Sequence, residues 1–139
     1  MPQDKKEQLY RQIEICTERD VLVAAAVGAA MARQVGFSTV DCACIETTIS
    51  ELARNQVVHA GGGMLELTVL TEGPFVGMRV QAVDSGKGIQ DVNTALQDGY
   101  STKETLGIGL GVAKRMMDDF SIRSCPGWGT QIVAVKWKR

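Results

Sequence analysis

The chain of 139 residues has neither a long hydrophobic run nor an excess of basic residues. Its longest apolar stretch, 21–32, is much shorter than the roughly 20 residues that a transmembrane helix needs. Its first ten residues have no apolar run of the kind that a secretory signal peptide contains. With 15 Lys and Arg against 16 Asp and Glu, the net charge is −1, which gives no basic surface for nucleic acid. We therefore expect a cytoplasmic protein that binds neither membranes nor nucleic acid.

Patterns typical of structural metal sites are also missing. None of the four cysteines belongs to a Cys-x-x-Cys pair, and His59 is the one histidine. Cys42 and Cys44 lie two residues apart in a helical pattern, so their side chains point about 200° apart, which is poor geometry for one metal. We interpret the cysteines as reduced thiols that pack as small apolar residues. His59 is expected to cap a helix end rather than to act in catalysis.

A hydrophobic content of 45% predicts one globular domain over 9–139, after a frayed N-terminus at 1–8. Hydrophobic periodicity and turn residues predict strands at 9–16, 64–72, 75–84, 120–125 and 130–137, and helices at 17–35, 38–60 and 110–119. Between them, 85–106 is predicted to be a mobile lid with one short helix near 91–97. This order predicts an α+β two-layer sandwich, with a mostly antiparallel sheet and its helices on one face.

The two long helices carry recognisable ends. Each opens with a capping-box pattern, at 17–20 and at 38–41, and each stops at glycine, at Gly36 and at 61–63. The first helix is apolar on more than one face, for which we prefer burial on two sides to a docking face for a partner. The second helix has a narrow stripe that is expected to be buried, formed by Ile45, Ile49, Leu52 and Gln56 with Ala53 at its flank, while Arg54 faces water.

Three groups of residues have a pattern suited to nucleotide chemistry. Glu51 and Asn55 lie four residues apart on one helix face, where a carboxylate suits a general base and an amide oxygen suits Mg²⁺. A solvated helix flank explains that pair equally simply. Asp84 ends a strand and points to its apolar face, and Gly86 and Gly88 follow. This segment is either a plain turn or an adenine pocket, in which the carboxylate accepts a hydrogen bond from the exocyclic amine.

The third group, Gly-x-Gly-x-Gly at 107–111, opens the last helix, where free backbone N–H groups can bind phosphate. It is not a P-loop, because Gly-x₄-Gly-Lys-Ser/Thr is missing, and no strand precedes it as in a Rossmann turn. The motif set of eukaryotic-type protein kinases is also missing.

In this order, the motifs resemble the Bergerat ATP-binding fold shared by DNA gyrase, heat-shock chaperone ninety, histidine kinases and MutL. The segments ELARN, VDSGKGI, GIGLG and GWGT carry the resemblance, which covers nearly the whole chain. Within that superfamily, the chain is most similar to small stand-alone serine kinases of bacterial partner-switching systems.

The resemblance implies a role for each matching residue. It assigns the general base to Glu51, the Mg²⁺ ligand to Asn55, the adenine-binding aspartate to Asp84 and an adenine-side threonine to Thr130. The glycines that shape the adenine pocket or bind phosphate would be Gly86, Gly88, Gly107, Gly109 and Gly111. The lid departs from the pattern, because related anti-sigma kinases carry an arginine there and Lys103 is the nearest cation in this chain.

The implied function is a serine/threonine kinase that uses ATP and Mg²⁺ to phosphorylate a STAS-domain scaffold protein in a stressosome pathway. The freed kinase would then bind and activate a PP2C-type phosphatase. The alternative is a nucleotide-controlled binding module of the anti-sigma-factor type, and Glu51 discriminates between them because a pure binder needs no general base. The ATP-binding half of a histidine kinase is a third interpretation, disfavoured because no helical segment with a phospho-accepting histidine precedes the domain.

Overall fold

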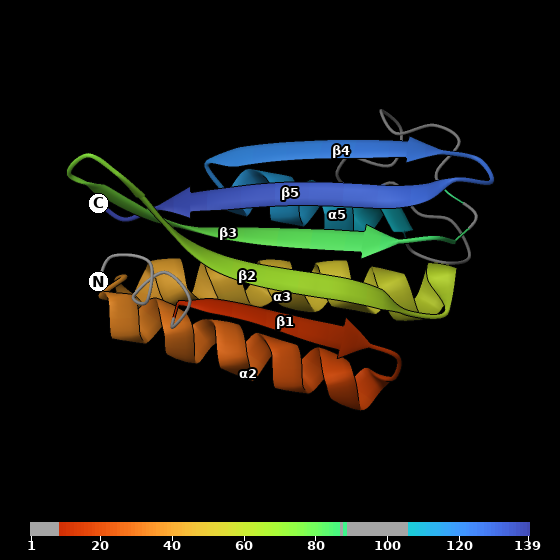
Figure 1. Cartoon of the computed structure of the whole chain (residues 1–139), viewed down its shortest axis with the longest axis horizontal. Coiled ribbons are helices and arrows are strands. Elements are labelled where there is room, and N and C mark those ends of the chain that lie inside the picture. Colours follow the sequence, from red (N-terminus) through yellow and green to blue (C-terminus); the bar gives the residue numbers. More distant parts are fainter. Residues whose placement is uncertain (1–8, 87, 89–105) are drawn as a thin grey trace.

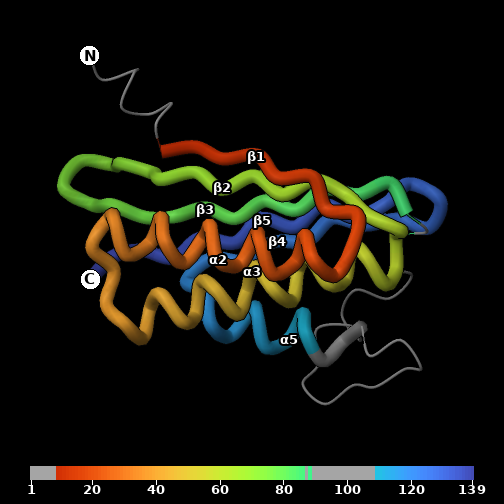
Figure 2. The backbone as a smooth tube through the Cα atoms, turned by 90° about the horizontal axis from the view of Figure 1, so that it is seen from below, coloured from red at the N-terminus to blue at the C-terminus, as the bar shows by residue number. Residues whose placement is uncertain are grey.

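The computed structural model describes residues 9–86, 88 and 106–139. Within these residues, an antiparallel sheet has the strand order β1-β2-β3-β5-β4, and the helices lie along one of its faces (Figures 1 and 2). The elements in chain order are β1 (Tyr10–Ile15), α2 (Glu18–Val35), α3 (Thr39–Ala60), β2 (Gly63–Glu72), β3 (Phe75–Asp84), α5 (Leu106–Met116), β4 (Asp119–Cys125) and β5 (Gly129–Trp137). The predicted α+β architecture is confirmed.

Alternating side chains give the sheet one buried and one open face. Met64 pairs with Val83 across β2 and β3, and Leu65 pairs with Ala82 in the next row. Leu65 and Ala82 are buried beneath the helices, whereas Val83 is 40% exposed. Because successive side chains on a strand point to opposite faces, the apolar row under the helices builds the core and the next row faces outward.

Helices α2 and α3 begin and end where the sequence predicts. Thr17 and Asp20 form a reciprocal capping box at the start of α2, and Ser38 accepts a hydrogen bond from the Asp41 amide at the start of α3. Gly36 and Gly61 have the left-handed backbone that terminates each helix. These caps fix where α3 starts and stops, and therefore which of its residues face the sheet.

The predicted stripe of α3 is confirmed as core. Ile45, Ile49, Leu52, Ala53 and Gln56 are all at most 1% exposed, and Arg54 is exposed as expected. None of the helices in the described part of the chain is long and apolar enough to cross a membrane.

The predicted burial of α2 on two sides is wrong. One side packs into the core through residues such as Val21 and Ala24, but Leu22 is 71% exposed and Val23 is 48% exposed. Only one layer of helices covers the sheet, so the outward side of α2 has nothing from the described chain to pack against.

The boundaries of the last helix also differ from the prediction. Helix α5 spans Leu106–Met116 instead of 110–119, and β4 already starts at Asp119. The Asp118 amide donates to the Val135 carbonyl oxygen at 2.9 Å, and the Asp118 carboxylate accepts from the Trp137 amide at 2.7 Å. These bonds to β5 draw residue 118 to the sheet and end the helix before it. The predicted frayed terminus at 1–8 and the short helix near 91–97 lie outside the described residues.

Candidate active site

The Glu51 carboxylate lies directly against the backbone of Gly109. Glu51 occupies the middle of α3, and Gly109 is in the first turn of α5, which packs alongside α3. A Cβ atom added to Gly109 would overlap a carboxylate oxygen of Glu51. The fold therefore brings together an acid and the start of the glycine-rich helix, two features that are more than fifty residues apart in the chain.

The second carboxylate oxygen of Glu51 is turned toward Arg54. The Arg54 guanidinium donates to Glu51 Oε1 at 3.4 Å, and the side chains of Arg54 and Glu51 are 44% and 29% exposed. The predicted exposure of Arg54 is confirmed, but its contact with Glu51 was not predicted. A half-exposed pair one helical turn apart adds little stability, but it leaves the Glu51 carboxylate accessible from solvent.

Asn55 lies one turn after Glu51 on the same side of α3 and is partly buried. Its amide nitrogen is buried and has no hydrogen-bond partner among the described residues. Since an unpaired buried amide is costly, this side chain is suited to contact a group that the chain itself does not supply. Its amide oxygen is a hard ligand of the kind that Mg²⁺ prefers.

Asp84 is the last residue of β3, and its carboxylate stabilises the tight turn that follows. Asp84 Oδ1 accepts a hydrogen bond from the Gly86 amide at 3.0 Å. A Cβ atom on Gly86 would lie 2.6 Å from the Cβ atom of Ala60, at the end of α3. Glycine is therefore required at position 86 for this turn to pack against the helix.

The pKa of the Asp84 carboxyl group is raised above its usual value. Partial burial raises the pKa of Asp84, whereas the backbone amides of Gly86 and Thr130 and the nearby His59 oppose that rise. His59 lies on α3 one turn beyond Asn55. Glu51, Asn55 and His59 thus follow one another at four-residue intervals, along about 12 Å of one helix face. A partly buried acid with a raised pKa, beside a helix that carries these side chains, is typical of a functional site.

Thr130 is buried opposite Asp84 in the pairing of β3 with β5. Its hydroxyl lies 2.8 Å from the Ser124 hydroxyl, which also donates to the Gly129 carbonyl oxygen at 2.8 Å. A Cβ atom on Gly88 would overlap the Cys125 carbonyl. Gly88 is therefore packed against the turn between β4 and β5.

Gln56 is buried as predicted, but the hydrogen bonds of its side chain were not predicted. Its side-chain nitrogen donates to the carbonyl oxygens of Met64 at 3.2 Å and Val83 at 3.1 Å. It thereby ties α3, one residue beyond Asn55, to the strand position immediately before Asp84. The available signal was the polar side chain itself, because a glutamine at a buried helix position needs hydrogen-bond partners.

The other predicted residues are placed only in part. Gly107, Gly109 and Gly111 lie in the first half of α5, as expected for the start of a helix. Lys103 and most of the predicted lid lie outside the described residues, so its role stays a prediction.

Comparison with known proteins gives one family. Residues 17–136 match the family described as the histidine kinase-like ATPase domain. The chain is 43% identical over 127 residues to the serine/threonine-protein kinase RsbT of Bacillus subtilis, which covers 91% of this chain and 96% of that protein. It is 31% identical to the anti-sigma F factor of Pasteuria penetrans, with 95% of this chain and 91% of that protein covered. A similar factor from Thermoanaerobacter sp. is also 31% identical, with 82% of each chain covered.

These matches agree with the architecture. The match spans every helix of the described chain and the strands that carry Asp84 and Thr130. The chain therefore belongs to the histidine kinase-like ATPase family.

Proposed function

We propose that this chain is a protein serine/threonine kinase that transfers the γ-phosphoryl group of ATP to a hydroxyl group of a partner protein. The observation that carries the proposal is the contact of the Glu51 carboxylate with Gly109 at the start of α5. A helix start attracts phosphate, and a carboxylate beside it is in position to receive the proton of an attacking hydroxyl. The 43% identity to a protein named as a serine/threonine kinase supports the same reaction.

Nucleotide would bind along α3, with its adenine at Asp84 and its phosphates at the start of α5. Asp84 accepts a hydrogen bond from the adenine amine, while Gly86 and Gly88 let the backbone approach the ring and Thr130 lines the adenine side. The family resemblance places Gly107, Gly109 and Gly111 against the phosphates, and the amides of the first turn of α5, which have no partner within the helix, would be the donors. Lys103 would supply the cation that faces the terminal phosphate.

Asn55 would hold Mg²⁺ through its amide oxygen, the kind of ligand that this ion prefers, as the family resemblance implies. The ion would neutralise charge on the phosphates during transfer. The protein would do the rest: α5 would hold the phosphates in place, and Glu51 would orient the acceptor hydroxyl.

The transfer forms one phosphorus–oxygen bond and breaks another. The acceptor oxygen attacks the γ-phosphorus, the bond between the γ-phosphorus and the bridging oxygen breaks, and ADP departs. The hydroxyl proton moves to the Glu51 carboxylate. Such a positioned base contributes about 10²–10⁴-fold to the rate.

The substrate we propose is a STAS-domain scaffold protein of a bacterial stressosome, with a PP2C-type phosphatase as a second partner that the free kinase activates. We propose that this takes place in the cytoplasm, where ATP is available. The family resemblance and the relative named RsbT support this assignment.

A second function is supported by the anti-sigma F factors among the relatives. In that case, the chain would regulate its partner mainly by nucleotide-controlled binding, and phosphorylation would be secondary. The presence of Glu51 beside the phosphate-binding helix start favours the kinase.

A phosphotransfer assay with radiolabelled ATP, Mg²⁺ and a STAS-domain protein from the same genome tests the proposal. We expect label to appear on the STAS protein at a serine or threonine, as judged by its stability in acid. Tight nucleotide-dependent binding without label would instead support the binding module.

A further inference from the structure

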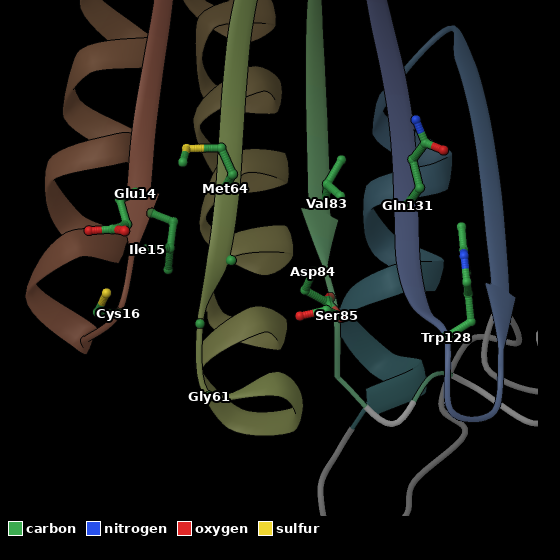
Figure 3. Close-up of a pocket in the computed structure, with 12 residues that line it drawn as sticks. Glu14, Ile15, Cys16, Gly61, Met64, Val83, Asp84, Ser85, Trp128 and Gln131 are labelled. Atoms are coloured by element: carbon green, nitrogen blue, oxygen red, sulfur yellow. The ribbon is translucent and has the colours of Figure 1, made fainter.

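A hollow of about 660 Å³ lies on the open face of the sheet, opposite the helices. Figure 3 shows it across the ends of β1, β2, β3 and β5, with Glu14 at one side and Trp128 at the other. Glu14, Met64, Val83 and Gln131 pair in one row across these strands. The hollow is therefore separated by the sheet from Glu51, which lies on the helix side.

The walls of the hollow are apolar with a negative end. Met64, Val83 and Trp128 contribute apolar surface. The described residues that line the hollow include Glu14 and Asp84, and none of them is a lysine, arginine or histidine. The Asp84 carboxylate is engaged with the Gly86 amide, whereas Glu14 is exposed. The hollow therefore complements an apolar segment with a positive charge near β1.

The neighbouring Cys16 reports the same negative potential. Partial desolvation and then the carboxylates of Glu14 and Asp20 raise the pKa of Cys16. A thiolate is disfavoured where a cation would be stabilised.

Trp128 lines one side of the hollow and lies on the turn between β4 and β5. Trp128 is 55% exposed. Its amide donates to the Cys125 carbonyl oxygen at 3.0 Å, which closes the turn between β4 and β5. Gly129 has a φ of 115°, and a Cβ atom there would overlap the Asp84 carbonyl. An exposed tryptophan on a turn held this closely is typical of a protein-binding site.

We infer that this hollow binds an extended segment of a protein partner, with a basic residue at the β1 end and apolar residues against Met64, Val83 and Trp128. Adjacent strands lie about 4.8 Å apart, so crossing from β1 to β5 spans about 14 Å. An extended chain advances about 3.4 Å per residue, so about four residues cover this distance. Of the residues proposed to act in phosphotransfer, the hollow shares Asp84 but not Glu51, Asn55 or Gly109, so the inference does not need the transfer reaction and is tested on the protein without nucleotide.

The chain offers an internal control for a binding experiment. It has two tryptophans, and the Trp137 indole donates to Asp119 at 3.1 Å, away from the hollow. The probes are the tetrapeptide acetyl-Arg-Leu-Val-Leu-amide and the same peptide with neutral citrulline in place of arginine. Binding is followed by ¹H–¹⁵N NMR of the full chain, through the two indole resonances and the amides of Met64 and Val83.

We expect the arginine peptide to shift the Trp128 indole and these amides in a saturable way, and to leave the Trp137 indole unchanged. Citrulline should weaken binding about three- to tenfold in the wild-type protein, because it removes the charge that faces Glu14. In Glu14→Gln, the two peptides should bind equally. Trp128→Ser, an exposed substitution that the fold tolerates, should weaken both peptides.

Three results would overturn the inference. The first is the absence of a saturable shift at Trp128, and the second is equal binding of the two peptides to the wild-type protein. The third is a dimer, detected by sedimentation, that Trp128→Ser dissociates, since a second copy of the chain would then occupy the hollow.

Discussion

Glu51 and Gly109 are in such close contact that no side chain fits at position 109 without displacing the Glu51 carboxylate. The acid lies on α3 and the glycine on α5, so packing of the two helices builds the candidate site. This contact predicts that the two residues depend on one another, which substitution at either position can test.

Gly109→Ala should impair catalysis more than stability. The added methyl group meets the mobile end of Glu51, which can move aside, and alanine favours a helix over glycine. A displacement of about 1 Å at a reacting group can cost about 100-fold in rate. We expect phosphotransfer to fall by about 10- to 100-fold while the melting temperature stays the same or rises. A variant with the wild-type rate would show that the position of Glu51 does not matter.

Asn55→Ala should abolish phosphotransfer and leave the fold intact. The side chain lies off the buried stripe of α3, and its amide nitrogen makes no hydrogen bond to the described chain. The measurement is the rate as a function of Mg²⁺ concentration, with circular dichroism as the control for folding. Near-normal transfer at low Mg²⁺ would contradict the assignment of Asn55 as a metal ligand.

Asp84→Asn should weaken ATP binding by about 10-fold or more. A hydrogen bond that involves a charged group contributes about 1.5–3 kcal/mol, and asparagine lacks the charge. Isothermal titration calorimetry gives the dissociation constant directly. Unchanged affinity in a folded variant would remove Asp84 from the adenine site.

In the protein without nucleotide, Asp84→Asn should also change how the free energy of unfolding depends on pH. Burial raises the pKa of Asp84 above its unfolded value, so the protonated form is the one that the fold favours. The contribution of Asp84 to stability is therefore fully present below the unfolded pKa and is lost as pH rises through the folded pKa. Relative to Asp84→Asn, the wild type should gain stability as pH falls toward 4. A constant difference between the two unfolding free energies would contradict this.

Gln56→Leu should destabilise the protein by about 1–3 kcal/mol, because the buried carbonyl groups of Met64 and Val83 lose their donor. Thr48→Val is a matched control on the same helix. Thr48 is also fully buried, but its hydroxyl has no hydrogen-bond partner among the described residues, so its loss should be nearly neutral. Urea unfolding of both variants measures the difference, and equal effects would show that the two bonds of Gln56 contribute nothing.

The sequence predicts best what is local. The caps at Thr17 and Ser38 and the buried stripe of α3 follow from patterns within a few residues, and all are confirmed. The end of α5 could not be predicted, because Asp118 is drawn to β5 by residues far along the chain. Likewise, Leu22 is exposed because a single layer of helices covers the sheet, and the sequence does not specify how many layers form.

In the candidate site, too, local features could be predicted and contacts between distant segments could not. Motif spacing singled out Glu51, Asn55 and Asp84 one by one, but it gave no information that Glu51 contacts Gly109 or that Gln56 anchors the strand before Asp84. The exposure of Trp128 could not be predicted, because the exposure of a turn residue depends on which distant elements cover that face of the sheet. Contacts between distant segments are set by packing, which residue types alone do not specify.

The most direct test of the kinase proposal is the single-turnover rate of phosphotransfer by Glu51→Gln, with Glu46→Gln as a matched control at an exposed position of the same helix. Glutamine keeps the shape of Glu51 and removes its basicity. We predict that Glu51→Gln binds ATP and the STAS partner normally but phosphorylates the partner at least about 100-fold more slowly, while Glu46→Gln behaves like the wild type. A wild-type rate in Glu51→Gln, or loss of partner binding instead of transfer, would contradict the proposed role of Glu51 as the general base.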